Sequence, residues 1–112
     1  MLRPAQFRAT ISFHFAEHGE GRQRFFVFPE SCHRPVPMEV EGLDGLNTLG
    51  MWTEEPASFQ EGDQVEVACR VLAPELLSPV IQPGAKFRLW DGGFFADGIV
   101  TARFDDAWVE EP

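Results

Sequence analysis

The chain has 112 residues and a net charge of −9, and 44% of its residues are apolar, including 11 Phe and 3 Trp. This length fits one domain and not two, and so many aromatic residues exclude a disordered chain. Each buried aromatic contributes about 1.5–3 kcal/mol. The negative charge opposes non-specific attraction to nucleic acid, because that affinity rests largely on Lys and Arg. We therefore predict a single folded domain over residues 1–112.

Targeting signals and disulfides are not expected. No apolar run approaches the roughly 20 residues that span a bilayer. The first eight residues lack the apolar core of a signal peptide. Cys32 and Cys69 are distant in sequence and make no disulfide framework, which suits a reducing compartment. We expect a soluble cytoplasmic protein with free thiols and no membrane association.

The first strand is predicted over Phe7–Phe15, where apolar residues occupy every odd position and polar residues every even one. A period of two is typical of a half-buried strand. Residues 17–22 are polar and rich in glycine, which predicts a loop. Arg24–Phe28 is β-prone and ends at Pro29, so it predicts a short second strand or the inner wall of a long connection.

The middle of the chain predicts short elements, because prolines and glycines between residues 29 and 56 disfavour long regular structure. We expect an edge strand over Val36–Glu41, where proline is tolerated, and another strand over Leu49–Thr53. A turn at Gln60–Asp63 then leads into Gln64–Leu72. The alternation of that segment predicts a second clear amphipathic strand.

The last third predicts a connector and a hairpin. Pro74–Pro79 is the connector, and its two leucines are candidates to plug one end of a barrel. Asp91-Gly92-Gly93 predicts a tight turn, since glycine adopts positive φ without steric cost. The strand after it is expected to run from about Phe94 to Phe104. The acidic tail, from about 105 to 112, is expected to fray. Several short strands with Gly/Pro turns predict an all-β barrel or sandwich.

Five weak motifs occur in a consistent order: Gly21-Arg22, Arg34-Pro35, Glu61-Gly62-Asp63-Gln64-Val65, Ser78-Pro79-Val80, and the hairpin within Pro83–Val100. With them the chain, from about Phe7 to Phe104, resembles domain III of elongation factor Tu. The resemblance implies a small antiparallel Greek-key barrel of six or seven strands. In that family the domain contacts the T-arm of aminoacyl-tRNA and the nucleotide-exchange partner. No phosphate-loop motif occurs here, so GTP binding is not implied.

Chemistry-bearing residues are few, and each has an ordinary explanation. Cys32-His33-Arg34 is the best candidate for a nucleophile, since a cationic neighbour lowers a thiol pKa. Adjacent residues of an extended chain point to opposite faces, however, so an ordinary loop cysteine is favoured.

A metal site is also weighed, and it would combine His14, His18 and His33 with Cys32 or Glu17. Their spacing matches no familiar zinc pattern. Paired carboxylates can do acid–base work or bind Ca²⁺, but Asp also favours turns and strand ends. The carboxylates in question are Asp91, Asp97, Asp105 and Asp106. We predict no catalytic residues, no metal and no cofactor.

An outward-facing Trp90 is expected if Phe87 and Leu89 face the core, and an outward Trp near a hairpin often anchors an interface. The alternative is packing of Trp90 against a neighbouring loop or the tail. The full candidate interaction surface consists of Arg22, Arg34, Pro35, Arg88, Trp90 and Phe94.

Three functions stay open. The first is a stand-alone protein-binding module, not an enzyme, which uses an exposed strand edge, the proline-rich 29–56 segment and Trp90 against a partner with a basic face. The second is RNA or tRNA binding, through Arg22, Arg34, Arg70 and Arg88. The third is a small-ligand-binding barrel or enzyme, which a concave apolar pocket lined by His33 and Asp residues would favour. An open barrel edge would also permit a homodimer.

Overall fold

A computed structural model describes residues 4–15 and 25–108, and its architecture is all-β, as predicted. The elements are β1 (Phe7–Phe13), β2 (Phe25–Phe28), β3 (His33–Val40), β4 (Asn47–Trp52), β5 (Ala57–Gln60), β6 (Gln64–Val71), α1 (Pro74–Leu77), β7 (Lys86–Trp90), β8 (Phe94–Arg103) and the 3₁₀ helix η2 (Asp105–Trp108). In these two ranges no helix is long and apolar enough to cross a bilayer.

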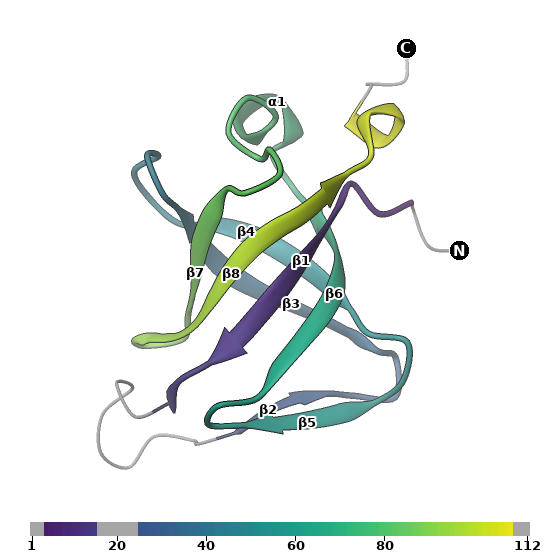
Figure 1. Cartoon of the computed structure of the whole chain (residues 1–112), viewed down its shortest axis with the longest axis vertical. Helices are drawn as coiled ribbons and strands as arrows, with labels where there is room; N and C mark the ends of the chain where they lie inside the picture. The colour runs from purple at the N-terminus through teal and green to yellow at the C-terminus, as the bar shows by residue number, and fades with distance from the viewer. Residues whose placement is uncertain (1–3, 16–24, 109–112) are drawn as a thin grey trace.

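Six strands form a closed antiparallel barrel in the order β1-β6-β4-β3-β7-β8, while β2 and β5 form a separate two-stranded ribbon. The barrel closes because β1 pairs with β6 on one side and with β8 on the other. Among the barrel strands, β3, β4 and β6 follow one another along the chain and lie side by side, and β7 returns to lie beside β3, which is a Greek-key connection. The ribbon lies at one end of the barrel, and α1 and η2 lie at the other (Figure 1).

Closure corrects in part the expectation of an exposed barrel edge. The strand predicted as an edge, β3, pairs with β4 along His33–Met38 and with β7 along Met38–Val40. Its prolines, Pro35 and Pro37, lie where β4 is its one paired neighbour. They therefore interrupt no hydrogen bond to β7, because proline lacks the backbone N–H that such a bond needs. Along His33–Pro37 the other side of β3 has no paired strand among those described, so the expectation of a homodimer stays a prediction.

The core follows the predicted alternation. Odd-numbered residues of β1 are buried up to Phe13, and Val67, Cys69 and Val71 of β6 face the same interior. At the ribbon end Phe13 stacks on Phe59 with ring centroids 5.3 Å apart, and Phe26 stacks on Phe95 at 5.1 Å. The aromatic residues of the ribbon therefore cap the barrel, which explains why these short strands are stable without further pairing.

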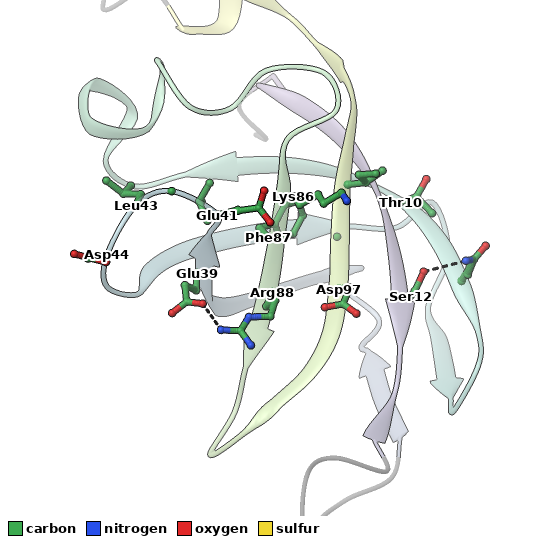
Figure 2. A pocket seen from close by; sticks show the side chains of 15 residues that line it. Thr10, Ser12, Glu39, Glu41, Leu43, Asp44, Lys86, Phe87, Arg88 and Asp97 are labelled. Atoms are coloured by element: carbon green, nitrogen blue, oxygen red, sulfur yellow. Dashed lines mark hydrogen bonds and ion pairs between the residues drawn. The ribbon is translucent and has the colours of Figure 1, made fainter.

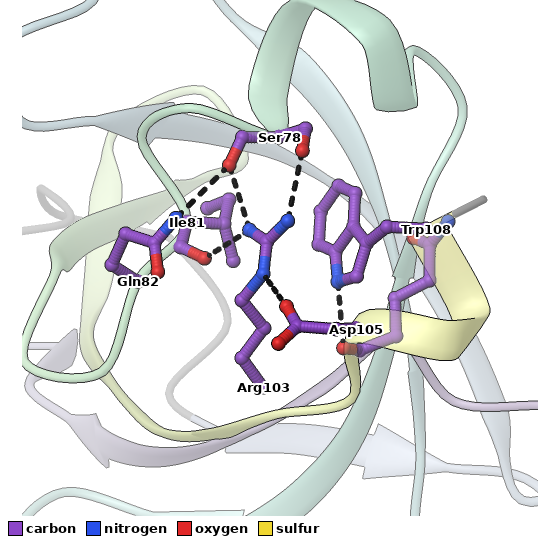
Figure 3. A network of polar contacts seen from close by, with 7 residues as sticks. Ser78, Ile81, Gln82, Arg103, Asp105 and Trp108 are labelled. Atoms are coloured by element: carbon purple, nitrogen blue, oxygen red, sulfur yellow. Dashed lines mark hydrogen bonds and ion pairs between the residues drawn. The ribbon is translucent and has the colours of Figure 1, made fainter.

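The opposite end is fixed by Arg103, which is mostly buried (Figure 3). Its Nη1 donates to the carbonyl oxygens of Ser78 and Ile81, both at 2.7 Å, and its Nη2 donates to Ser78 Oγ at 2.8 Å. Its Nε pairs with Asp105 at 2.6 Å, and its guanidinium lies 4.5 Å from the Trp108 ring centroid. Charge-assisted bonds of this kind are about twice as strong as neutral ones.

The expected fraying of the tail is therefore wrong for residues 105–108, because η2 is tied to the barrel. Trp108 donates from Nε1 to the Gln6 carbonyl oxygen at 2.9 Å and stacks on Phe7 with centroids 6.2 Å apart. The expectation that leucines plug the barrel holds for Leu77, which is fully buried, and not for Leu76, which is half exposed. The rest of the tail lies outside the described residues.

The predicted hairpin is present. Gly92 lies in the turn between β7 and β8 with φ 72°, as the Asp-Gly-Gly motif indicates. In the strands, Gly98 pairs with Phe87, and the Phe87 ring covers the position where a side chain at 98 would project. Glycine is needed there because the ring and a Cβ atom would occupy the same space.

Candidate interaction surfaces

The β7–β8 hairpin brings three of the six predicted interaction residues together. Arg88 and Trp90 are exposed on the outer face of β7, and Trp90 pairs across the hairpin with Phe94. The Arg88 guanidinium lies 3.7 Å from the Phe94 ring centroid and also pairs with Glu39 of β3. Trp90 is 37% exposed, so the sequence expectation of an outward Trp is confirmed.

Arg88 of this cluster also lines a hollow on the outer face of the barrel (Figure 2). Two rows of side chains cross it, as the strand register dictates. Ser12, Asp97, Arg88 and Glu39 form one row, and Thr10, Ile99 and Lys86 form the next. We call the hollow together with Trp90 and Phe94 the hairpin face.

The hairpin face carries more negative than positive charge. Four carboxylates line the hollow against two cationic side chains. Glu39 is paired with Arg88, and Asp97 lies 3.0 Å from His14. Glu41 and Asp44 are exposed at the end of β3 and in the turn after it, and no ion pair to either is found within residues 4–15 and 25–108. These two carboxylates are thus positioned to meet a cation from outside.

The remaining predicted residues lie elsewhere. Arg34 faces the ribbon, where its Nη1 donates to the Val27 carbonyl oxygen at 2.7 Å and its guanidinium lies 4.2 Å from the Phe26 ring centroid. It therefore joins the ribbon to the barrel. Arg22 lies outside the described residues. Pro35 is exposed on the outer face of β3, in a second concavity.

This second concavity, which we call the aromatic slot, crosses the outer face of β3, β4 and β6. His33 and Trp52 are cross-strand partners, and their rings stack with centroids 4.4 Å apart and planes 21° apart. Both rings lie against Gly50, where an added Cβ would meet Trp52 Cη2 at 3.1 Å and His33 Nε2 at 3.2 Å. Other lining residues are Pro4, Gln6, Pro35, Thr48, Arg70, Val71, Leu72, Pro74, Glu75, Asp106, Ala107 and Trp108.

Some polar groups that line the slot have hydrogen-bond partners and one has none among the described residues. Arg70 donates from Nη1 to the Pro4 carbonyl oxygen at 2.6 Å. Trp52 Nε1 is buried and has no hydrogen-bond partner among the described residues. Leu72, at one wall, is 80% exposed. The sequence reasoning gave Trp52 and Leu72 no role, although a glycine two residues before a tryptophan in one strand is a signal that the ring can pack against that glycine.

The described residues considered for catalysis or metal binding are not brought together in one site. Cys32 lies in a turn with φ 60°, and its Sγ is 3.8 Å from the Glu30 carbonyl oxygen. The ring of the neighbouring His33 stacks on Trp52. Cys69 is buried, and burial raises the pKa of its thiol far above the usual range. No group of three His, Cys, Asp or Glu side chains that could hold a metal is found among the described residues. His18 and Glu17 lie outside those residues.

The four aspartates also have separate positions. Asp91 lies in the hairpin turn and Asp97 in the hollow of the hairpin face, while Asp105 pairs with Arg103. Asp106 lines the aromatic slot.

No family model matches this chain, and no curated protein is similar to it at a significant level.

Proposed function

We propose that this protein is a protein-binding module that uses the hairpin face. The observation that carries the proposal is the combination of an exposed Trp90 with a hollow in which carboxylates outnumber cations. Tryptophan contributes much contact area with few rotatable bonds and is enriched among the residues that dominate binding energy. Trp90 would supply the affinity of the contact, and the charges around it would orient the partner.

The partner is expected to present a basic segment. Glu41 and Asp44 would pair with its Lys or Arg side chains, and the overall charge of −9 would speed the encounter. Arg88 would act differently, because its guanidinium already contacts Glu39 and Phe94. It would hold the Phe94 ring in place beneath the partner. The face can act without catalysis, and we assign the protein no enzymatic role.

The finer resemblance to domain III of elongation factor Tu belongs to this proposal as well. The order of five weak motifs and the antiparallel barrel support it. RNA binding receives less support, because the arginines that it needs are separated. Arg34 contacts the ribbon, Arg70 lies in the aromatic slot and Arg88 on the hairpin face. The free Cys32 and Cys69 support a cytoplasmic, reducing location.

The test is a pull-down from lysate of the source cells at low salt, with one sample treated with RNase, using the wild type and two charge variants. The double variant Glu41→Lys/Asp44→Lys changes the hairpin face. The double variant Glu54→Lys/Glu55→Lys changes two exposed carboxylates between β4 and β5 by the same total charge, so it is the matched control.

We expect a protein partner that survives RNase and is lost in the first variant and in Trp90→Ala, but kept in the control. Equal loss in both charge variants would mean that global charge, and not this face, attracts the partner. Recovery of tRNA that disappears when salt is raised would replace the proposal with the RNA-binding alternative.

A further inference from the structure

We propose that the aromatic slot binds a neutral planar heteroaromatic molecule that carries a ring-nitrogen or carbonyl hydrogen-bond acceptor. This site is separate from the hairpin face, so the proposal goes beyond protein binding and does not depend on it. Three observations carry it: a platform of two stacked aromatic rings, an apolar wall held in place by the fold, and a distribution of polar groups that selects against anions.

The platform is made by His33 and Trp52. A glycine in the interior of a paired strand weakens that strand, and it often marks a close approach to the backbone. Here Gly50 lets both rings lie against β4, since an added Cβ would lie 3.1–3.2 Å from their atoms. The result is a stacked pair that forms part of the lining of a concave site. Aromatic rings prefer offset stacking on such surfaces, which contributes about 0.5–1.5 kcal/mol beyond burial.

The wall consists of Leu72, Pro74 and Trp108, which line the same slot. Trp108 is fixed by its hydrogen bond to Gln6, by stacking on Phe7 and by the guanidinium of Arg103. Leu72 is the most exposed large apolar residue among those described, at 80%. A ligand in the slot that covers Leu72 would remove its side chain from water, which contributes about 25 cal/mol per Å² of apolar surface. A fixed wall also lowers the entropy cost of binding.

The polar groups define the ligand further. Trp52 Nε1 is a buried donor without a partner among the described residues, and leaving such a donor unsatisfied costs about 1–3 kcal/mol. A ring nitrogen or carbonyl oxygen of the ligand would accept from it after a small tilt of the stacked rings. Glu75 and Asp106 line the same slot, and its one arginine, Arg70, already donates to the Pro4 carbonyl oxygen. Because the protein also has a charge of −9, an anionic ligand would be repelled. The geometry therefore favours a neutral heteroaromatic over a phosphorylated one.

The experiment titrates the purified full chain with adenosine, AMP and indole by calorimetry, supported by ligand-observed NMR. Adenosine is a neutral heteroaromatic probe with ring acceptors, AMP adds charge to the same ring, and indole represents the side chain of a partner protein. We expect saturable binding of adenosine by the wild type. AMP should bind to the wild type at least tenfold more weakly, and Trp52→Ala should bind adenosine at least tenfold more weakly. Trp52→Phe, which keeps an aromatic ring and loses the Nε1–H donor, should weaken the binding of adenosine several-fold.

Trp90→Ala, outside the slot, is the control and should bind adenosine as the wild type does. Thermal unfolding of every variant separates loss of binding from loss of fold. Binding of indole alone would overturn the proposal and indicate an aromatic side chain of a partner. AMP binding as tight as adenosine would overturn the selection against anions. No saturable binding of any probe by the folded wild type would overturn the site itself.

Discussion

Replacement of Gly98 by alanine tests the packing of the barrel most directly. An added Cβ would lie 2.7 Å from Phe87 Cε1 and closer still to Cζ and Cε2, whereas carbon atoms pack at about 3.5–4.0 Å. Phe87 is 2% exposed and makes an edge-to-face contact with Phe7 at 6.4 Å, so its ring has no free space in which to move.

The expected size of the effect follows from two opposing terms. Overpacking of this kind costs about 1–3 kcal/mol, and we take the upper end because three ring atoms are too close. Alanine also restricts the unfolded chain, which stabilises by about 0.4–1 kcal/mol. The net expectation for Gly98→Ala is a loss of about 2 kcal/mol in the free energy of unfolding, or a fall of about 8 °C in Tm for a chain of this length.

The assay is urea denaturation of Gly98→Ala, Phe87→Leu and the double variant. Because leucine is smaller than phenylalanine, the double variant should lose at least about 1 kcal/mol less than the sum of the two single losses. The reasoning would be refuted by a Gly98→Ala protein as stable as the wild type, or by strictly additive losses, since either would mean that the Phe87 ring does not need a glycine beneath it.

Three further predictions follow from the described contacts. Arg103→Lys should lower the free energy of unfolding by about 2 kcal/mol, because one ammonium group cannot replace the hydrogen bonds of the guanidinium to both the segment after α1 and η2. A loss below about 0.5 kcal/mol in denaturant titration would contradict the role of Arg103 as the tie between α1 and η2. Trp90→Ala should shift Tm by less than about 2 °C, since an exposed residue contributes little to stability; a large drop in calorimetry would place Trp90 in the structural core instead. Iodoacetamide at pH 8 should label Cys32 and leave Cys69 unlabelled in the native state, because burial raises the pKa of the Cys69 thiol and blocks access to it. Equal labelling of Cys32 and Cys69 by mass spectrometry would contradict this expectation. As the control, both cysteines should react in denaturant.

Local patterns in the sequence were sufficient for much of the fold. The alternation of Phe7–Phe15 and Gln64–Leu72 predicted β1 and β6, because side chains of a strand alternate between a core and a solvent face. The turn at Gly92 was also predicted from a local pattern, since glycine adopts positive φ without steric cost. The outward orientation of Trp90 followed from the same alternation.

The two proposed binding surfaces depend on contacts that no local pattern encodes. Closure of the barrel requires β1 to pair with β8, some 90 residues away, and β7 covers the Met38–Val40 part of the edge that β3 was expected to expose. The role of Arg34 was likewise decided by where the β2–β5 ribbon lies, and the aromatic slot is assembled from the outer face of the barrel together with α1 and η2. The sequence alone determined the strands with clear alternation and which of their residues face outward, because these are properties of neighbouring residues, but it gave no sign of β5. The tertiary structure decided which outward residues meet, because that depends on the register between distant strands.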